Sequence, residues 1–495
     1  MTKDGRFVAW SVATVVLVAQ LVAPPVAEAA PAATDGALTS GDWLIPNQGN
    51  GGYDVEHYDV DLEFFPDPHA APGTVVEDCS DESGNGPGSI KATTTVHATT
   101  TSLLRSFGLD FKGLTVTRVT VDGVAAQFSR VQDAAADKFK LVVTPAAPVT
   151  GDFEVAVAYE GVPETYQFDA GFDMGQGWMK TWDYCGEGGD HFSDGGATGI
   201  GQPAGGFTWF PNNTTPTDKA TYTIRLTGPS EYTGLSVGVL TDESALAGGR
   251  TSWTWDVTVP TTTFLVFVSF GAYDVRTSTV ELLDGSTIPQ WSVGHDFMKE
   301  DVAYDIDDLD GLVGEVIRWH EARFGHYQPT SAGYLLAPLM SGWALETVGR
   351  PVFTWAMNEI VVVHEYAHQW AGDSVSVTDW SDLWLAEGFA TYAEWLWEGD
   401  HGGAGPLEVG RSLLTSSPLH AHWKQRVAAP TRAELWGWGS YDGGGLALAA
   451  LQAGVGDDAF FRIMRTWFDR YANSNASTWD FIALAEEVSG RELTA

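Results

Sequence analysis

Cysteines, basic residues and long apolar runs are all scarce in this 495-residue sequence. Its two cysteines, Cys79 and Cys185, are too few for a disulfide framework, and whether they form one bridge in an exported chain stays open. The 26 lysines and arginines face 65 aspartates and glutamates, which gives a formal net charge of −39. Such a surface repels phosphate backbones and anionic lipids, so we expect no nucleic-acid partner. After the N-terminal stretch no run is long and apolar enough to span a bilayer, so we expect no stable membrane insertion of the mature chain.

Residues 1–29 have the pattern of a secretory signal peptide. A short basic start precedes the mostly apolar stretch 7–23, and Ala27-Glu28-Ala29 offers small residues for cleavage before Ala30. We therefore expect a secreted, extracellular protein that is cleaved near Ala29–Ala30. An uncleaved membrane anchor is the alternative.

Residues 30–273 read as an all-β domain. Segments such as Tyr53–Leu62 and Tyr222–Leu226 alternate apolar and polar residues at period two, which is typical of half-buried strands. Turn residues separate these segments. We predict packed antiparallel sheets, with glycine- and aspartate-rich surface loops at 80–89 and 186–206.

Residues 274–495 read as a second, mainly α domain. Helical spacing extends over Ile306–Phe324, and residues 457–471 and 478–490 also predict helices. The stretch Tyr334–Leu339 reads as an edge strand, because a central strand does not tolerate its proline. The chain is therefore predicted to be multidomain, with sheets first and helices second.

The stretch His364-Glu365-Tyr366-Ala367-His368 fits the H-E-x-x-H zinc pattern. Residues four apart lie on one face of a helix, so both imidazoles can point at one ion. Apolar flanks predict a largely buried helix that stops at Gly372. Burying two histidines and a glutamate is costly unless a partner such as a metal pairs with them. The Glu365 carboxylate is then placed to reach a water at an open zinc position.

Catalytic zinc sites hold the ion with three protein ligands and a water, and His, His and Glu form one such set. Glu387 follows His368 with eighteen residues between them, at the start of a second apolar helix. That separation leaves room for a loop and a return helix beside the first. The sequence thus offers His364, His368 and Glu387 as candidate ligands for one Zn²⁺ per chain.

This arrangement, with HQWAGDSVS and WLAEGFATYAEWLW around it, resembles the gluzincin metallopeptidases and specifically the aminopeptidase N family. The resemblance is to a short, secreted bacterial type without the C-terminal helical domain. It implies that His364, His368 and Glu387 bind zinc and that Glu365 is the general base. It also implies that residues 274–495 form a thermolysin-like catalytic domain.

Three further residues resemble the family's substrate-binding elements, in altered surroundings. The segment Gly342–Thr347 resembles the G-A-M-E-N motif, which implies that Glu346 binds the free α-amino group of the substrate. Tyr441 matches a tyrosine whose hydroxyl points at the scissile carbonyl. Gln202 matches a glutamine that contacts the substrate backbone, although Thr214 stands where the family usually has an acidic residue.

These residues indicate a secreted zinc aminopeptidase that acts on peptides with a free N-terminus. One alternative is a gluzincin endopeptidase, against which Glu346 argues because an endopeptidase needs no amine anchor. A second is a related hydrolase of lipid epoxides, and a third is a non-catalytic peptide-binding protein on the same fold. Glu394, seven residues after Glu387, is a candidate partner of a zinc-binding histidine.

Overall fold

The computed structural model describes residue 1 and residues 32–68, 74–75, 86–168, 175–181, 184–185, 191–193, 195–295, 306–337, 339, 343–354, 357–416 and 421–493. The described residues from Ala33 onward belong to one compact unit. The predicted signal peptide, its cleavage site and Cys79 lie outside the described residues. Export and a Cys79–Cys185 bridge therefore stay predictions.

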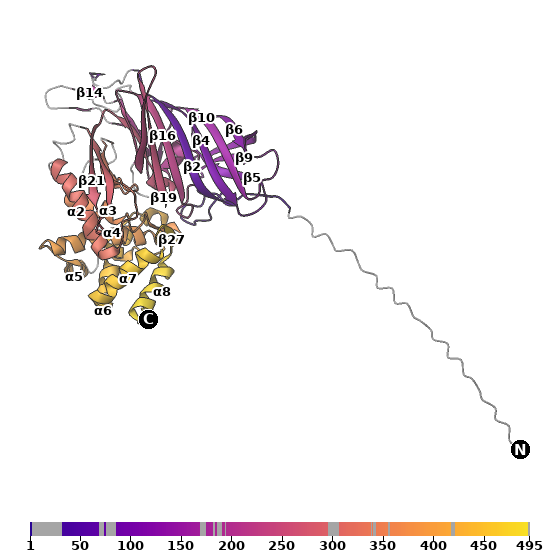
Figure 1. Ribbon diagram of the computed structural model, residues 1–495. Helices are drawn as coiled ribbons and strands as arrows, with labels where there is room; N and C mark the ends of the chain where they lie inside the picture. Colours follow the sequence, from indigo (N-terminus) through magenta and orange to yellow (C-terminus); the bar gives the residue numbers. More distant parts are fainter. Residues whose placement is uncertain are drawn as a thin grey trace. The chain divides into compact units, whose positions relative to one another are not determined.

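The period-two pattern builds a large sheet that runs through the first half of the compact unit (Figure 1). Along β2, buried residues such as Leu62 and Phe64 alternate with half-buried or exposed ones, and a bulge near His57 shifts the register. Only β16 and β2 run parallel among the paired strands of this sheet. Its eight strands, in spatial order, are β18 (Val239–Leu246), β19 (Arg250–Thr261), β16 (Ala220–Pro229), β2 (Tyr53–Phe65), β4 (Ser89–Thr100), β10 (Asp152–Gly161), β6 (Thr115–Val121) and β7 (Val124–Ala125).

Three smaller sheets complete the β-rich part and confirm the predicted all-β, multi-sheet start of the chain. They too are antiparallel, except that β1 runs parallel to β5. The first has the order β1 (Thr34–Asp35), β5 (Leu104–Asp110), β9 (Lys138–Thr144), β8 (Gln127–Asp133). The second has the order β11 (Thr165–Gln167), β12 (Gly175–Lys180), β15 (Ala197–Ile200), β20 (Val268–Gly271), β17 (Thr233–Ser236), and the third β13 (Tyr184–Cys185), β14 (His191–Ser193), β3 (Thr74–Val75).

The later part of the predicted surface loop 186–206 is instead a buried strand. All four residues of β15 are buried, and β15 lies in the middle of its five-stranded sheet. The reason is Gly199, where an added Cβ would come within 2.8 Å of Trp209 and 2.9 Å of Trp178. The glycine makes room for two tryptophan rings, so its presence does not mark a loop.

A further five-stranded sheet precedes the zinc-binding helix and corrects a second prediction. Its spatial order is β21 (Asp274–Glu281), β22 (Thr287–Gly294), β23 (Ala332–Leu336), β25 (Val352–Phe353), β24 (Ala344–Leu345). The predicted edge strand, β23, is thus the central strand, with all five residues buried. It ends at Leu336, before Pro338, so the proline removes no hydrogen bond from the sheet.

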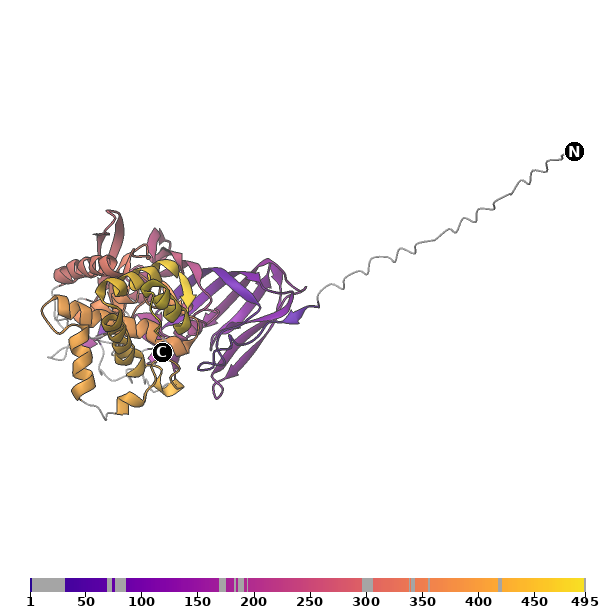
Figure 2. The same ribbon diagram turned by 90° about the horizontal axis from the view of Figure 1, so that it is seen from below.

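The second half of the chain is mainly helical, as predicted, and its helices gather at one end of the unit (Figures 1 and 2). They are α2 (Ile306–Phe324), α3 (Glu359–Ala367), α4 (Trp384–Asp400), α5 (Pro406–Ser416), α6 (Gly444–Val455), α7 (Asp457–Arg470) and α8 (Thr478–Ser489), with a small parallel pair β26 (Val375–Val377) and β27 (Ser474–Ala476). A capping box at Ser477 starts α8 and left-handed Gly490 ends it. In the described part of the chain, no helix combines the length and the apolar character needed to cross a membrane.

The helical part and the β-rich part share apolar packing. Val293, Leu335, Leu345 and Val352 belong to the same buried cluster as the core of the large sheet. The predicted boundary between residues 273 and 274 therefore stays a prediction, because the core continues across it.

Candidate active site

Helix α3 presents the two histidines of the zinc pattern. Asn358 caps its start by accepting a hydrogen bond from the Val361 amide at 3.1 Å, and Val362 and Val363 are buried. The helix ends at Ala367, earlier than the predicted stop at Gly372. His368 keeps helical backbone angles (φ −60°, ψ −26°), so it still lies on the same face as His364.

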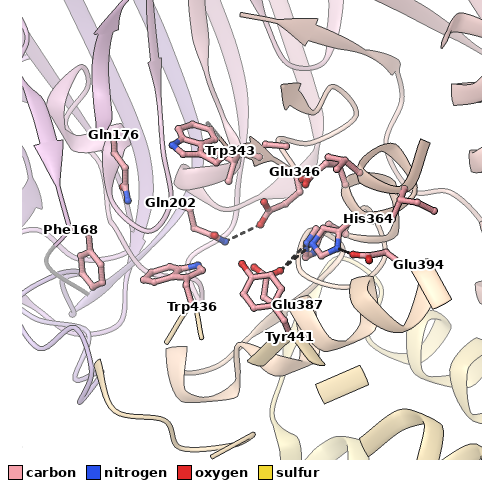
Figure 3. Close-up of a pocket in the computed structure, with 16 residues that line it drawn as sticks. Phe168, Gln176, Gln202, Trp343, Glu346, His364, Glu387, Glu394, Trp436 and Tyr441 are labelled. Atoms are coloured by element: carbon pink, nitrogen blue, oxygen red, sulfur yellow. Dashed lines mark hydrogen bonds and ion pairs between the residues drawn. The ribbon is translucent and has the colours of Figure 1, made fainter. Parts of the chain in front are cut away.

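Each histidine is oriented by a hydrogen bond from its Nδ1–H. His364 donates to Oε1 of Glu394 at 2.5 Å, and His368 donates to the Ala371 carbonyl oxygen at 2.9 Å. Figure 3 shows Glu394 on the far side of His364 from Glu387. With both Nδ1 atoms donating, the two Nε2 lone pairs are free to bind a cation. The predicted role of Glu394 as a partner of a zinc-binding histidine agrees with this contact.

Glu387, in the first turn of α4, completes a site whose spacing suits zinc. Its Oε2 lies 3.4 Å from Nε2 of His364 and 3.3 Å from Nε2 of His368. Ligand atoms about 2.0–2.1 Å from a tetrahedral zinc are themselves about 3.3 Å apart. The two histidine–glutamate distances therefore suit zinc, and within the described part of the chain the three residues form one of two clusters close enough to hold a metal.

The charges at this site mark the place of a cation. Burial acts to raise the pKa of Glu387, but the charge of His368 and the hydrogen bonds from both histidines outweigh it and hold the pKa at about 2. Burial acts to lower the pKa of His368, yet Glu387 and Glu346 raise it to about 9. The buried carboxylates thus demand positive charge between them, which two imidazole protons or one metal ion can supply.

Glu365 lies next to the first ligand and is buried, with 6% of its surface exposed. Burial raises the pKa of its carboxyl to about 8, although His364 and His368 act to lower it. Its carboxylate belongs to the second of the two clusters, with Glu346 and His368, in which the nearest side-chain atoms lie within 4.8 Å of one another. A carboxylate there can exchange a proton with a water or an amine near the metal.

Glu346 follows the short strand β24 and is brought beside the zinc residues. Gln202 donates from Nε2 to Oε1 of Glu346 at 2.9 Å, and Gln369 of the turn after α3 donates to the Glu346 carbonyl oxygen at 2.9 Å. Burial raises the pKa of Glu346, and His368 acts against this. The structure therefore joins Gln202, Glu346 and the zinc site, which lie far apart in the sequence (Figure 3).

A buried arginine fixes the turn that carries Glu346. Arg350 donates to the carbonyl oxygens of Ser236 and Gly238, and its guanidinium packs against both Trp255 and Trp291, 4.8 Å and 5.1 Å from the ring centroids. These contacts tie the turn to the β-rich part of the unit. The position of Glu346 thus depends on packing between the two parts.

Tyr441 lies beside the candidate zinc site, in the middle of the π-helical turn η6 (Gly439–Gly443) that leads into α6. Its ring is nearly parallel to that of His364, with centroids 6.1 Å apart and an angle of 15°. Burial and then the charge of Glu387 raise its pKa well above the usual value. The phenol therefore stays protonated at neutral pH and can donate a hydrogen bond.

The site opens into a cavity of about 390 Å³. One side carries the zinc residues, Glu346, Glu365 and Tyr441. The other side carries Phe168, Gln176, Gln202, Trp343 and Trp436, as Figure 3 shows. The sequence analysis identified Gln202 but missed Phe168, Gln176 and Trp436, which come from three separate segments and carry no local pattern.

The comparisons with known proteins agree with this geometry. The sequence profile of the Peptidase family M1 domain matches residues 354–495. Aminopeptidase N of Streptomyces lividans is 25% identical over 303 residues, which are 56% of this chain and 34% of that protein. Human glutamyl aminopeptidase is 27% identical over 310 residues, 57% of this chain and 31% of that protein. The chain thus spans about a third of the length of these curated relatives.

A solved structure matches over nearly the whole chain. The M1 zinc metallopeptidase of Deinococcus radiodurans aligns with a TM-score of 0.76 at 26% identity, covering 92% of this chain and 94% of that one. A variant of that enzyme was solved with a Tyr-Ser-Ala substrate, and it aligns with a TM-score of 0.75, also at 26% identity.

The fold and the site together match those of zinc metallopeptidases of the gluzincin type. Within that class, the chain is similar to the aminopeptidase N-like members of peptidase family M1. The matched solved structures are zinc enzymes, in agreement with the ligand spacing described above.

Proposed function

We propose that the protein is a secreted zinc aminopeptidase that hydrolyses the first peptide bond of peptides with a free N-terminus. The observation that carries this proposal is the buried Glu346 carboxylate next to the metal ligands. A carboxylate held there binds an α-ammonium group through a charge-assisted hydrogen bond. An ammonium fixed at that point leaves only the first peptide bond within reach of the metal, which distinguishes an aminopeptidase from an endopeptidase.

The residues of the site divide the reaction between them. His364, His368 and Glu387 would hold one zinc ion per chain, which would supply a Lewis acid and lower the pKa of a bound water. Glu365 accepts a proton from the attacking water and passes it to the leaving amine. Tyr441 donates a hydrogen bond to the carbonyl oxygen as negative charge develops on it.

The substrate's N-terminus is held on the opposite side of the scissile bond. Glu346 accepts hydrogen bonds from the ammonium group. Gln202, already paired with Glu346 at 2.9 Å, orients that carboxylate and reaches the substrate backbone. The net charge of −39 favours cationic or neutral peptides over nucleic acids as partners.

Hydrolysis of aminoacyl amides tests this proposal. Free and N-acetylated copies of the same amides are compared with and without a zinc chelator, and zinc is counted by metal analysis. We expect chelator-sensitive cleavage of the free amines alone, and one zinc per chain. Cleavage of the acetylated copies would indicate an endopeptidase, and zinc binding without any cleavage would indicate a peptide-binding protein.

Export is tested separately. Sequencing the N-terminus of protein recovered from the culture medium should show a chain that begins near Ala30. Protein that stays with the cells and keeps residues 1–29 would contradict this part of the proposal.

A further inference from the structure

The wall of the cavity that faces the zinc residues is mainly aromatic. Phe168 is buried and packs edge to face against Trp436, with centroids 5.3 Å apart at 83°. Arg432 covers the Phe168 ring from 4.2 Å and is itself paired with Asp137. These contacts hold Phe168 in place. A rigid aromatic wall suits a large, flat side chain.

The charge of the lining is of one sign. Its described residues include four carboxylates, namely Glu346, Glu365, Glu387 and Glu394, and neither lysine nor arginine. A zinc ion bound by His364, His368 and Glu387 would offset part of this charge. Toward Phe168 and Trp436 no cation lines the cavity, so an acidic side chain would find no partner in the described lining.

One polar group is set into this aromatic wall. Gln176 lies on β12, and its Oε1 is buried with no hydrogen-bond partner among the described residues. Figure 3 shows the side chain of Gln176 extending toward Phe168 and Gln202. An amide that has no protein partner for its oxygen can pair with a group that enters the cavity.

The backbone opposite Gln176 is shaped to accept it. Gly201 has a φ of +136°, and a Cβ added there would come within 2.6 Å of Cβ and 2.9 Å of Cγ of Gln176. The stem of Gln176 therefore occupies the space that a side chain at position 201 would fill. Gly201 is followed directly by Gln202, which joins this corner of the cavity to the Glu346 anchor.

We propose that Phe168, Gln176, Trp343 and Trp436 receive the side chain of the substrate's N-terminal residue, and that the Gln176 amide selects tyrosine over phenylalanine. This inference rests on the proposed aminopeptidase function. A substrate held by its ammonium group at Glu346 and Gln202 turns its first side chain toward this wall. A tyrosine hydroxyl both donates and accepts, so it pairs with the amide in either orientation, whereas phenylalanine leaves the amide unpaired.

The test compares kcat/KM for 4-nitroanilides of tyrosine, phenylalanine, leucine and glutamate, which share one leaving group. For the wild-type holoenzyme we expect tyrosine to exceed phenylalanine by about tenfold, as one additional hydrogen bond in a desolvated pocket allows. We expect the glutamate substrate to be at least about tenfold slower than the leucine substrate, because of the acidic lining.

Two variants isolate the amide. Gln176→Leu and Gln176→Met remove it while keeping most of the side-chain volume, and each should bring the tyrosine-to-phenylalanine ratio close to one. Gln127→Leu, on the exposed strand β8, is the matched control and should keep the wild-type ratio.

The outcomes separate this inference from the function beneath it. The role of Gln176 is refuted if the wild-type tyrosine-to-phenylalanine ratio is near one. It is also refuted if Gln176→Leu and Gln176→Met leave that ratio unchanged. In either case, cleavage of the leucine substrate would still support the aminopeptidase function. Failure to cleave any of the free aminoacyl substrates refutes the proposed function itself. Because the wild-type ratio is informative alone, the inference stays testable even if one variant does not fold.

Discussion

Replacing Glu394 should loosen the metal without touching any of its ligands. Glu394 accepts the Nδ1–H of His364 at 2.5 Å, and its side chain is 25% exposed. This contact fixes which nitrogen of His364 faces the metal, and its negative charge makes that nitrogen a better donor. The two effects can be separated, because glutamine keeps an acceptor oxygen whereas alanine removes it.

The size of the loss follows from that distinction. Removing a hydrogen-bonding partner of a metal-bound histidine costs about 10- to 100-fold in metal affinity, or about 1.4 to 2.8 kcal/mol. We expect Glu394→Gln to lie near the lower value, because it loses only the charge. Glu394→Ala should lie near the upper value, because His364 then loses its orienting contact as well.

The assay is competition for zinc between the protein and a chelator of known affinity, at fixed pH. Glu398→Gln is the matched control, because Glu398 lies one turn later on the same helix and is exposed. It removes the same charge from α4 without a contact to a zinc ligand. If Glu394→Ala bound zinc as tightly as this control, the contact with His364 would have no role in holding the metal.

Three further outcomes follow from the same structure. Glu365→Gln should abolish turnover and keep a full complement of zinc, because it removes the base but no ligand. Tyr441→Phe should lower kcat by about 100- to 1,000-fold, the usual effect of losing one oxyanion donor. His320→Phe should make stability less sensitive to acid, since burial lowers the pKa of His320 from 6.5 to about 3. Below pH 6.5 the unfolded chain therefore binds a proton that the folded chain does not, and denaturant unfolding at pH 7 and pH 5 should show about 2 kcal/mol less loss in the variant.

Each of these outcomes has its control. If Glu365→Gln retained turnover, Glu365 could not be the general base. If the variant lost zinc, its activity would report on folding of the site and not on the base. Tyr471→Phe, outside the cavity, is the control for Tyr441, and equal rates in the two would assign Tyr441 to structure. The exposed residue His326 serves the same purpose for His320: equal pH dependence in His320→Phe and His326→Phe would contradict the argument from burial.

The metal site could be read from the sequence because its geometry is local. The separation of His364 and His368 is set by one turn of helix, and the helical continuation through His368 is what the apolar flanks predict. The prediction of Glu387 as the third ligand required only the assumption that a second helix returns beside the first. The boundaries of α2 and α8 were also predictable, because periodicity and a capping box lie within the segments themselves.

Other features depended on distant contacts and were misread or missed. Gly199 suggested a loop, yet its role is to admit Trp178 and Trp209 into a buried sheet. The proline at 338 suggested an edge strand, yet β23 ends before it. In both cases the residue type was read correctly, and the error lay in which neighbours surround it, which no window of local sequence contains.

The two sides of the cavity differ in the same way, because one is built from segments close in the sequence and the other from segments far apart. The proposed chemistry at the scissile bond uses residues from α3, α4 and the turn before α6, which the helical packing places together. Gly388 and Gly444 allow that packing, since a Cβ at Gly388 would come within 2.6 Å of the Gly444 Cα. The wall that faces the substrate uses β12, the segment after β11 and a loop residue, Trp436. These segments meet only because the β-rich part packs on the helices, through contacts such as those of Arg350. The proposed reaction type can therefore be inferred from short stretches of the sequence. The proposed choice of substrate instead depends on the packing of the β-rich part on the helices.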